Sequence, residues 1–337
     1  MSKIISAALG NITEYSLNWP STAHGSTHEL VIDEAHIYVT GQNMDQIAKC
    51  NYGGQVVDYY KMPDGSGPHG ILIDKHGRLW VSLEFFGLVV QLDDQGKIVK
   101  EIDVRLFVQG AKTPINPAPH GICLDADGET IWFTGKRTST VGKINPDSSV
   151  EHFQLNNLAA MPIFLSAGAD GNIWGTELLA SAILNIFGDG TVREFPIPTS
   201  NSRPIAVIPD PSSPFMWFTE EAGVKIGKID LSGKITEYPV PALQKNDILA
   251  SLVFDYDDNL WVQVYVDQNN PNPSGYDYIL KFDKSIRHIE GSDIAGIPFS
   301  MHTLPSRGTM MHRIKMDYKG NLWFTEMMTD KLGKITL

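Results

Sequence analysis

The sequence has few cysteines, few basic residues and no long apolar run, and each shortage excludes a class of protein. Only Cys50 and Cys123 are present among 337 residues, so no disulfide framework can form, and neither cysteine lies in a metal-binding spacing. Two reduced thiols predict a cytoplasmic protein. No apolar run reaches the roughly 18 residues of a membrane span, so we expect no membrane partner.

Basic residues are outnumbered by acidic ones. The chain has 27 Lys plus Arg against 39 Asp plus Glu, a net charge of −12. Because nucleic-acid binding depends on basic residues that neutralise phosphates, nucleic acid is excluded as a main partner. The 42% of hydrophobic and 20% of charged residues are typical of a globular chain. No helical periodicity of useful length is present, which favours an all-β protein.

What the sequence does contain is an internal repeat marked by one aromatic anchor in each unit. Successive anchors are 42, 52, 42, 43, 44 and 62 residues apart. The seven anchors are Tyr38, Trp80, Trp132, Trp174, Trp217, Trp261 and Trp323. Short apolar or alternating runs between Asp-x-x-Gly turns surround each anchor, at the spacing of a four-stranded propeller blade. The repeat predicts an all-β, seven-bladed β-propeller of four-stranded blades, a single domain over residues 1–337 and a monomer.

The two chain ends predict how the ring closes. The last unit stops one strand short at Leu337, and the segment Gly10–Leu17 resembles Gly233–Val240, the outer strand of another unit. We expect the N-terminal strand to pair into the last blade and close the ring, which removes the exposed sheet edges. The two long steps between anchors predict insertions at residues 104–118 and 265–310, and insertions of this kind often lie at the binding end of a repeat array.

Four motifs resemble the virginiamycin B lyase (streptogramin lyase) family over nearly the whole chain. They are Pro-His-Gly-Ile at 68–71 and 119–122, Gly-x-Leu/Ile-Trp-Phe-Thr-Glu, Lys-Ile-Gly-Lys-Ile at 225–229 and Gly-Lys-Ile-Thr-Glu-Tyr-Pro at 233–239. The resemblance implies a seven-bladed propeller that opens a cyclic depsipeptide by Mg²⁺-assisted β-elimination. It also implies a catalytic histidine and glutamate in the last blade, positions that His312 and Glu326 match. The second histidine that it implies is replaced by Ala250, and His302 in the neighbouring insertion is the candidate substitute.

The position at the start of the first strand carries a histidine in four blades that the closed ring makes contiguous. These residues are His28, His69, His120 and His312. The other blades carry Ile163-Phe164, Pro204-Ile205 and Ala250-Ser251 at this position, so we expect a funnel with one titratable side and one apolar side, suited to a small molecule. The position after the anchor adds Glu84 and Glu326. Imidazole and carboxylate together can hold a divalent ion, here Mg²⁺ with Ca²⁺ as the alternative.

From these residues we predict a lyase-like enzyme acting on a small cyclic or ester-bearing organic molecule. We expect His312 to be the general acid or base, with Glu326 as its metal or orienting partner. The predicted substrate-binding residues are His28, His69, His120, Glu84, Arg313 and His302, and the predicted metal ligands are Glu326 and Glu84. The alternatives are a ring-forming or pericyclic enzyme of secondary metabolism, a lactone hydrolase, and a non-catalytic propeller that presents loops to a protein partner.

Overall fold

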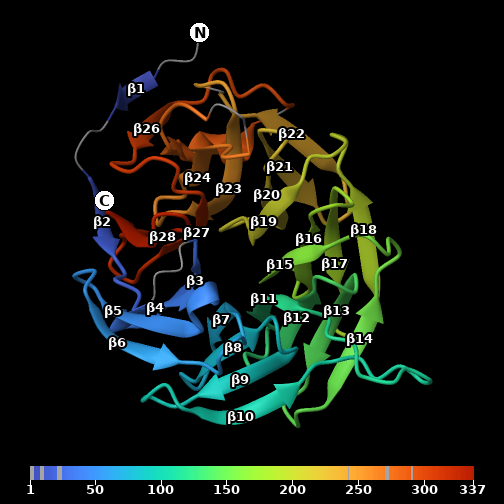
Figure 1. The fold of residues 1–337 in the computed structure, drawn as a ribbon. Coiled ribbons are helices and arrows are strands. Elements are labelled where there is room, and N and C mark those ends of the chain that lie inside the picture. The colour runs from blue at the N-terminus through green and yellow to red at the C-terminus, as the bar shows by residue number, and fades with distance from the viewer. Residues whose placement is uncertain (1–3, 8–10, 21–24, 242, 270–272, 290) are drawn as a thin grey trace.

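The chain forms seven antiparallel sheets arranged around a central opening (Figure 1). The computed structural model describes residues 4–7, 11–20, 25–241, 243–269, 273–289 and 291–337. In these ranges no helix is both long and apolar enough to cross a membrane. The predicted all-β, seven-bladed propeller is confirmed, with four strands in every blade except the sixth, which has a fifth.

Each blade runs from an inner strand at the opening to an outer strand at the rim. Blade one comprises β3 (Thr27–Ile32), β4 (His36–Gly41), β5 (Gln46–Asn51) and β6 (Val56–Lys61). Blade two comprises β7 (Pro68–Ile73), β8 (Leu79–Leu83), β9 (Leu88–Leu92) and β10 (Ile98–Asp103). Blade three comprises β11 (Pro119–Leu124), β12 (Ile131–Gly135), β13 (Thr140–Ile144) and β14 (Val150–Gln154). Blade four comprises β15 (Pro162–Ala167), β16 (Ile173–Glu177), β17 (Ala182–Ile186) and β18 (Val192–Pro196).

The remaining three blades keep this order. Blade five comprises β19 (Pro204–Pro209), β20 (Phe215–Glu220), β21 (Lys225–Asp230) and β22 (Ile235–Pro239). Blade six comprises β23 (Asp247–Phe254), β24 (Leu260–Val266), β25 (Tyr278–Phe282) and β26 (Phe299–Thr303), with β1 (Ile4–Ala7) added parallel to β26. Blade seven comprises β27 (Met311–Met316), β28 (Leu322–Glu326), β29 (Lys331–Ile335) and β2 (Ile12–Ser16). Two short 3₁₀ turns, Gln42–Met44 and Lys284–His288, complete the elements.

The repeated tryptophan is a buried core residue whose polar atom is satisfied by the repeated turn aspartate. The indole N–H of Trp323 donates to Asp317 Oδ2 at 2.8 Å, and Trp132 bonds Asp125 in the same way. Both tryptophans are fully buried. A large aromatic side chain contributes much apolar area to a core, and the aspartate removes the cost of burying its N–H. The Asp-x-x-Gly turn and the anchor therefore form one structural unit.

The ring closes through the N-terminal strand, as predicted. β2 pairs antiparallel with β29, with Thr13 opposite Lys334. Tyr15 of β2 lies 6.1 Å from Trp323 between ring centroids, the place that Tyr238 takes beside Trp217 in blade five. Residue Gly10 of the expected segment lies outside the described residues. Blade seven therefore combines strands from both parts of the chain, which joins the first and last blades of the ring.

Candidate active site

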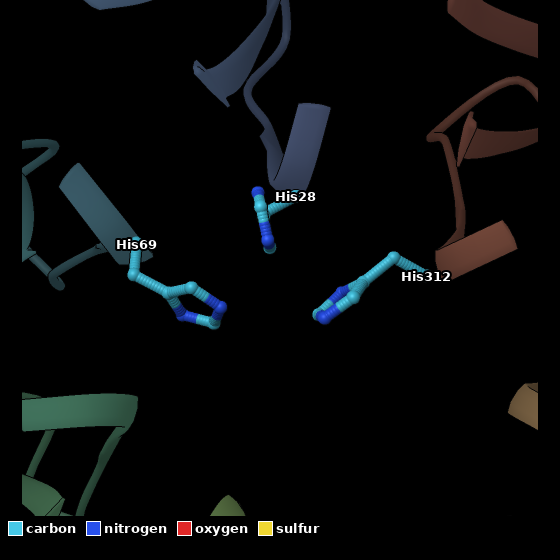
Figure 2. A group of neighbouring side chains, drawn as sticks. All are labelled: His28, His69 and His312. Atoms are coloured by element: carbon cyan, nitrogen blue, oxygen red, sulfur yellow. The ribbon is translucent and has the colours of Figure 1, made fainter. Parts of the chain in front are cut away.

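Four histidines meet at one end of the central opening. His28, His69, His120 and His312 lie at the start of the inner strands β3, β7, β11 and β27. Ring centroids are 5.0 Å apart for His28 and His69, 5.1 Å for His28 and His312, and 3.6 Å for His69 and His120. Figure 2 shows the rings of His28, His69 and His312 pointing from three blades toward one region of the opening. The structure thus brings together four of the predicted site residues.

The backbone of three of the four histidines is held by the blade before it. The hydroxyl groups of Thr325, Thr40 and Ser82 donate to the carbonyl oxygens of His28, His69 and His120, at 2.6, 2.9 and 3.3 Å respectively. These hydroxyl residues lie on the second strands β28, β4 and β8. The second strand of one blade therefore positions the histidine of the next through a hydroxyl residue two positions after the aromatic anchor.

The rings are also held at one nitrogen. His28 Nδ1 lies 2.7 Å from the carbonyl oxygen of Ser26, His69 Nδ1 lies 3.2 Å from that of His120, and His120 Nδ1 lies 2.9 Å from that of Ile163. A carbonyl oxygen can only accept, so Nδ1 of each ring carries the proton and Nε2 keeps its lone pair. Nε2 of His69 is buried and has no hydrogen-bond partner among the described residues.

Burial keeps all four imidazoles uncharged. It lowers the pKa of His28, against the smaller opposing effects of the Ser26 carbonyl and Glu29. For His69, His120 and His312, burial moves the pKa well below the usual range, and neighbouring imidazoles or Lys136 add to the effect. An uncharged imidazole with a free lone pair is a base and a metal ligand.

The histidines line a cavity of about 240 Å³, which we call the histidine cavity. Its opposite wall is largely apolar and contains Ile163, Ile205 and Ala250, which the sequence places in the corresponding positions of the other blades. The cavity is also lined by Leu178, Tyr265, Met310, Met311 and Met327. One side of the cavity can therefore bind or move a proton, while the other accepts an apolar part of a ligand.

Two carboxylates reach this end of the opening, and both are already paired. Glu84 is buried, accepts from Gln42 at 2.7 Å and forms an ion pair with Lys136 at 3.2 Å. A ligand atom of Glu84 lies within 4.8 Å of ligand atoms of His69 and His120. Across the cavity, Glu221 accepts from Arg203 at 2.6 Å and from the Tyr265 hydroxyl at 3.0 Å.

The floor of the histidine cavity is a buried ion pair between blades seven and one. Arg313 donates to Glu29 through Nε at 2.7 Å and through a second nitrogen. Its guanidinium carbon lies 4.3 Å from the ring centre of Phe164 in blade four, so this side chain crosses the opening. Arg313 borders both the histidine cavity and a second cavity of about 420 Å³ on the other side.

Glu29 also faces His312. Its Oε1 lies 3.4 Å from His312 Nδ1. Burial alone would raise the pKa of Glu29, but the Arg313 ion pair and hydrogen bonds, with a smaller effect of His312, hold that pKa well below its usual range. The carboxylate is therefore ionised and lies beside the His312 ring, whose Nδ1 makes no hydrogen bond among the described residues.

Sequence reasoning did not single out Glu29, although a signal was present. The residue after the histidine is glycine in blades two and three, Gly70 and Gly121, but is charged in blades one and seven. Because blades one and seven are neighbours in the closed ring, the opposite charges of Glu29 and Arg313 could have been predicted to pair.

Two predicted site residues lie elsewhere. The His302 ring packs against Trp261 with 4.9 Å between centroids, and its Nε2 lies 3.1 Å from Ser300 Oγ. Glu326 is fully buried at the end of β28, where the Thr329 hydroxyl donates to it at 2.5 Å. Neither residue is among those that line the histidine cavity. The roles expected for them from the sequence stay predictions.

Glu326 has two counterparts in other blades. Glu177 and Glu220 end the second strands β16 and β20 and are also fully buried, with carboxylate oxygens that have no hydrogen-bond partner among the described residues. Burial raises the pKa of all three carboxyl groups to about 8. Because the three glutamates share this environment, we expect each of them to have a structural role.

The pair Glu177→Gln and Glu326→Gln tests that role. A group whose pKa is higher in the folded state contributes stability that is present below the unfolded pKa of 4.5 and is lost as the pH rises through about 8. For each glutamine variant we compare the free energy of unfolding with that of the wild type at the same pH. We expect this difference to be about 1–3 kcal/mol more favourable to the variant at pH 8 than at pH 5. Urea unfolding at the two pH values measures this difference.

The same two variants show whether Glu326 has a structural or a catalytic role. From burial alone we expect both variants to keep turnover within about threefold of the wild type. A loss of turnover in Glu326→Gln, but not in Glu177→Gln, would give Glu326 the catalytic role that the family resemblance implies. Equal stability effects at pH 5 and pH 8 would show that neither carboxyl group titrates in the folded protein as described.

Comparisons with known proteins agree with the propeller fold and identify a family. The sequence model of the virginiamycin B lyase family matches residues 93–270. Virginiamycin B lyase of Nocardia farcinica is 32% identical over 202 residues, which are 52% of this chain and 70% of that protein. The solved virginiamycin B lyase of Staphylococcus aureus superposes with a TM-score of 0.78 at 25% identity, over 97% of this chain and 99% of that one. A catalytically inactive histidine variant of the S. aureus enzyme, solved with quinupristin, superposes with a TM-score of 0.76 at 24% identity over the same shares.

Proposed function

The chain belongs to the virginiamycin B lyase family, and from that premise we propose that it is a carbon–oxygen lyase working in the histidine cavity. The proposed substrate is a cyclic or ester-bearing organic molecule. One of its carbons bears an acidic proton, and the adjacent carbon bears an acyloxy group. Quinupristin, which was solved with the S. aureus relative, is the first candidate. The observation that carries the proposal is the convergence of four uncharged imidazoles on one cavity, with the buried Nε2 of His69 lacking a hydrogen-bond partner among the described residues.

The reaction is an elimination that consumes no water. An imidazole nitrogen takes the proton from the carbon next to a carbonyl group, and the C–H electron pair becomes a carbon–carbon double bond. The bond from the neighbouring carbon to the ester oxygen breaks, and its electron pair leaves with the carboxylate. General-base catalysis of this kind needs an unprotonated base within hydrogen-bond reach of the proton.

The charged groups around the cavity suit the product. Lys136 lines the cavity and is held there by Glu84. A cation at this place attracts the carboxylate that leaves, and such fixed charges act strongly in a site that excludes water. The apolar wall of the cavity excludes water and so disfavours the competing hydrolysis.

Mg²⁺, which the resemblance implies, does not fit the free donor atoms of the histidine cavity. Mg²⁺ takes oxygen ligands, above all carboxylates. Glu84, Glu221 and Glu29 are the carboxylates at or beside the cavity, and each is engaged by a basic partner. The free donors are imidazole nitrogens, so no step proposed here runs through Mg²⁺.

Exposed apolar side chains surround the same end of the propeller and support an apolar substrate. Phe107, in the insertion at residues 104–118, is 74% exposed. The other members of this apolar rim are Phe85, Phe86, Val108, Ile115, Leu158, Leu179 and Met328. All lie in loops at the end where the inner strands begin. Apolar groups gathered around a cavity mark a surface that binds an apolar partner.

The apolar rim gives a prediction about substrate binding. Phe107→Ser should raise KM about three- to tenfold and leave kcat unchanged, because the rim contacts a remote part of the substrate equally in the ground and transition states. Tyr318→Ser is the matched control, since Tyr318 is 65% exposed in the β27–β28 loop at the opposite end. A fall in kcat in the Phe107 variant, or an equal rise of KM in the control, would contradict this assignment.

The reaction type is tested by the mass of the product. The purified chain is incubated with quinupristin and with simpler acyloxy amides in isotope-labelled water. Elimination within a ring yields a linear isomer of unchanged mass, with a new double bond and no label. Incorporation of labelled oxygen would identify a hydrolase and overturn the proposal, and so would binding of these compounds in the histidine cavity without turnover.

A further inference from the structure

We propose that the histidine cavity binds a divalent transition-metal ion, of the class of Zn²⁺, through Nε2 of His28, His69 and His312. The site is assembled from three adjacent blades: seven, one and two. His69 and His312 are separated by 243 positions in the sequence (312 − 69), so only the closed ring brings them together. The role of the metal ion as the electrophile of the elimination rests on the function proposed above. The existence of the metal site does not rest on it.

The first support is the spacing of the rings. The three centroid distances are 5.0 Å for His28 and His69, 5.1 Å for His28 and His312, and 5.6 Å for His69 and His312. Three imidazoles on a tetrahedral ion, with Zn–N bonds of about 2.0–2.1 Å, place their ring centres roughly 5 Å apart. One candidate ligand atom from each histidine lies within 4.8 Å of the others, and Figure 2 shows the rings converging.

The second support is the partner of each outer nitrogen. His28 Nδ1 and His69 Nδ1 face carbonyl oxygens, and His312 Nδ1 faces the ionised Glu29 carboxylate. Histidine ligands of metal ions in proteins almost always give the second nitrogen to a carbonyl or a carboxylate, which orients the ring and fixes the tautomer. His28 and His69 show this arrangement as hydrogen bonds, while His312 Nδ1 lies 3.4 Å from Glu29 Oε1 without a hydrogen bond. The buried Nε2 of His69 has no partner among the described residues.

The donor set selects the ion. Imidazole nitrogen suits Zn²⁺, Fe²⁺, Ni²⁺ and Cu²⁺, whereas Mg²⁺ and Ca²⁺ prefer oxygen. Three protein ligands leave a fourth position open, which is the pattern of catalytic rather than structural zinc sites. The open position faces the cavity, because the wall opposite the histidines contains Ile163, Ile205 and Ala250, which offer no ligating side chain.

Held by these three histidines, such an ion would supply the elimination with a Lewis acid for the substrate carbonyl oxygen, which would stabilise the negative charge left when the neighbouring carbon loses its proton. With three imidazoles bound to the ion, His120 is the fourth imidazole of the cavity and takes the proton at Nε2. Its Nδ1 proton is held by the Ile163 carbonyl. His120 lies against His69, with 3.6 Å between ring centroids, so base and electrophile are adjacent.

Metal binding is tested without any substrate. The full chain is stripped with a chelator, dialysed and titrated with Co²⁺, whose visible absorption reports a tetrahedral site, and separately with Zn²⁺ and Mg²⁺ by calorimetry. We expect one equivalent of Co²⁺ with tetrahedral bands, tighter Zn²⁺ binding and no measurable Mg²⁺ binding. His69→Ala and His69→Gln should each weaken Co²⁺ binding at least about a hundredfold. His76→Ala should leave it unchanged, because His76 is exposed and pairs with Glu129 away from the cavity.

The outcomes separate the two claims. Absence of tetrahedral Co²⁺ bands, or Co²⁺ binding that the His69 variants leave intact, overturns the metal site. The glutamine variant and circular dichroism guard against a loss of fold. If tetrahedral Co²⁺ bands appear but turnover survives chelation, the metal site is supported. The proposed role of the ion in catalysis is then overturned. Such bands in a protein that turns over no ester overturn the proposed lyase function alone.

Discussion

His312→Ala should lower kcat/KM at least about a thousandfold for any substrate that the histidine cavity turns over. The imidazole lies in the cavity wall, faces Glu29 with one nitrogen and converges with His28 and His69. Its removal takes away one of three converging imidazoles, and the preceding blade carries Ala250 at the corresponding position. The fold should survive, since the truncated side chain borders a cavity rather than the packed core.

Steady-state kinetics, with circular dichroism as the check on folding, measures this effect. His302→Ala is the matched control: it removes the histidine that packs against Trp261 outside the cavity. It should lower the free energy of unfolding but keep kcat/KM within about threefold. A folded His312→Ala protein with wild-type turnover would contradict the site, and so would a collapse of turnover in the His302 variant, which would place the chemistry in blade six.

The fold could be predicted from the sequence because its cause is local and repeated. One indole, one turn aspartate and one second-strand hydroxyl recur in most blades, and the indole–aspartate contact repeats, as Trp132 and Trp323 show. Ring closure was predictable for a similar reason, since Tyr15 occupies the place that Tyr238 fills in an intact blade. The convergence of the histidines then follows from the geometry of the ring.

The environment of individual side chains could not be predicted in this way. Glu326 and Glu84 both follow the second-strand anchor, yet Glu326 is buried away from the cavity lining, while Glu84 lies beside His69 and His120. The surroundings of these two carboxylates differ because the neighbouring blades pack different side chains against them. That packing cannot be predicted from the repeat pattern. The sequence also did not predict that Phe164 would cover the Arg313 guanidinium from across the opening.

Arg313→Met should lower the free energy of unfolding by about 3–5 kcal/mol, the usual cost of removing one partner of a buried ion pair. Glu29 would then stay buried without its ion-pair partner, with the His312 imidazole and the Lys315 side chain as neighbours. The pair joins residues 284 positions apart in the chain, so its loss loosens the junction between the first and last blades. Urea unfolding at neutral pH measures the effect.

The double variant Glu29→Gln/Arg313→Met distinguishes the cost of an orphaned charge from the loss of a contact. Because both charges are gone, most of the lost stability should return, as it does when a buried pair is replaced by residues of similar volume. Turnover should not return with it: His312 Nδ1 would face a neutral amide, and weakening such a partner typically costs about 10–100-fold in activity or metal affinity. A double variant as unstable as Arg313→Met would mean that the guanidinium contributes mainly through its packing on Phe164. Full activity in the stable double variant would mean that Glu29 orients no catalytic group.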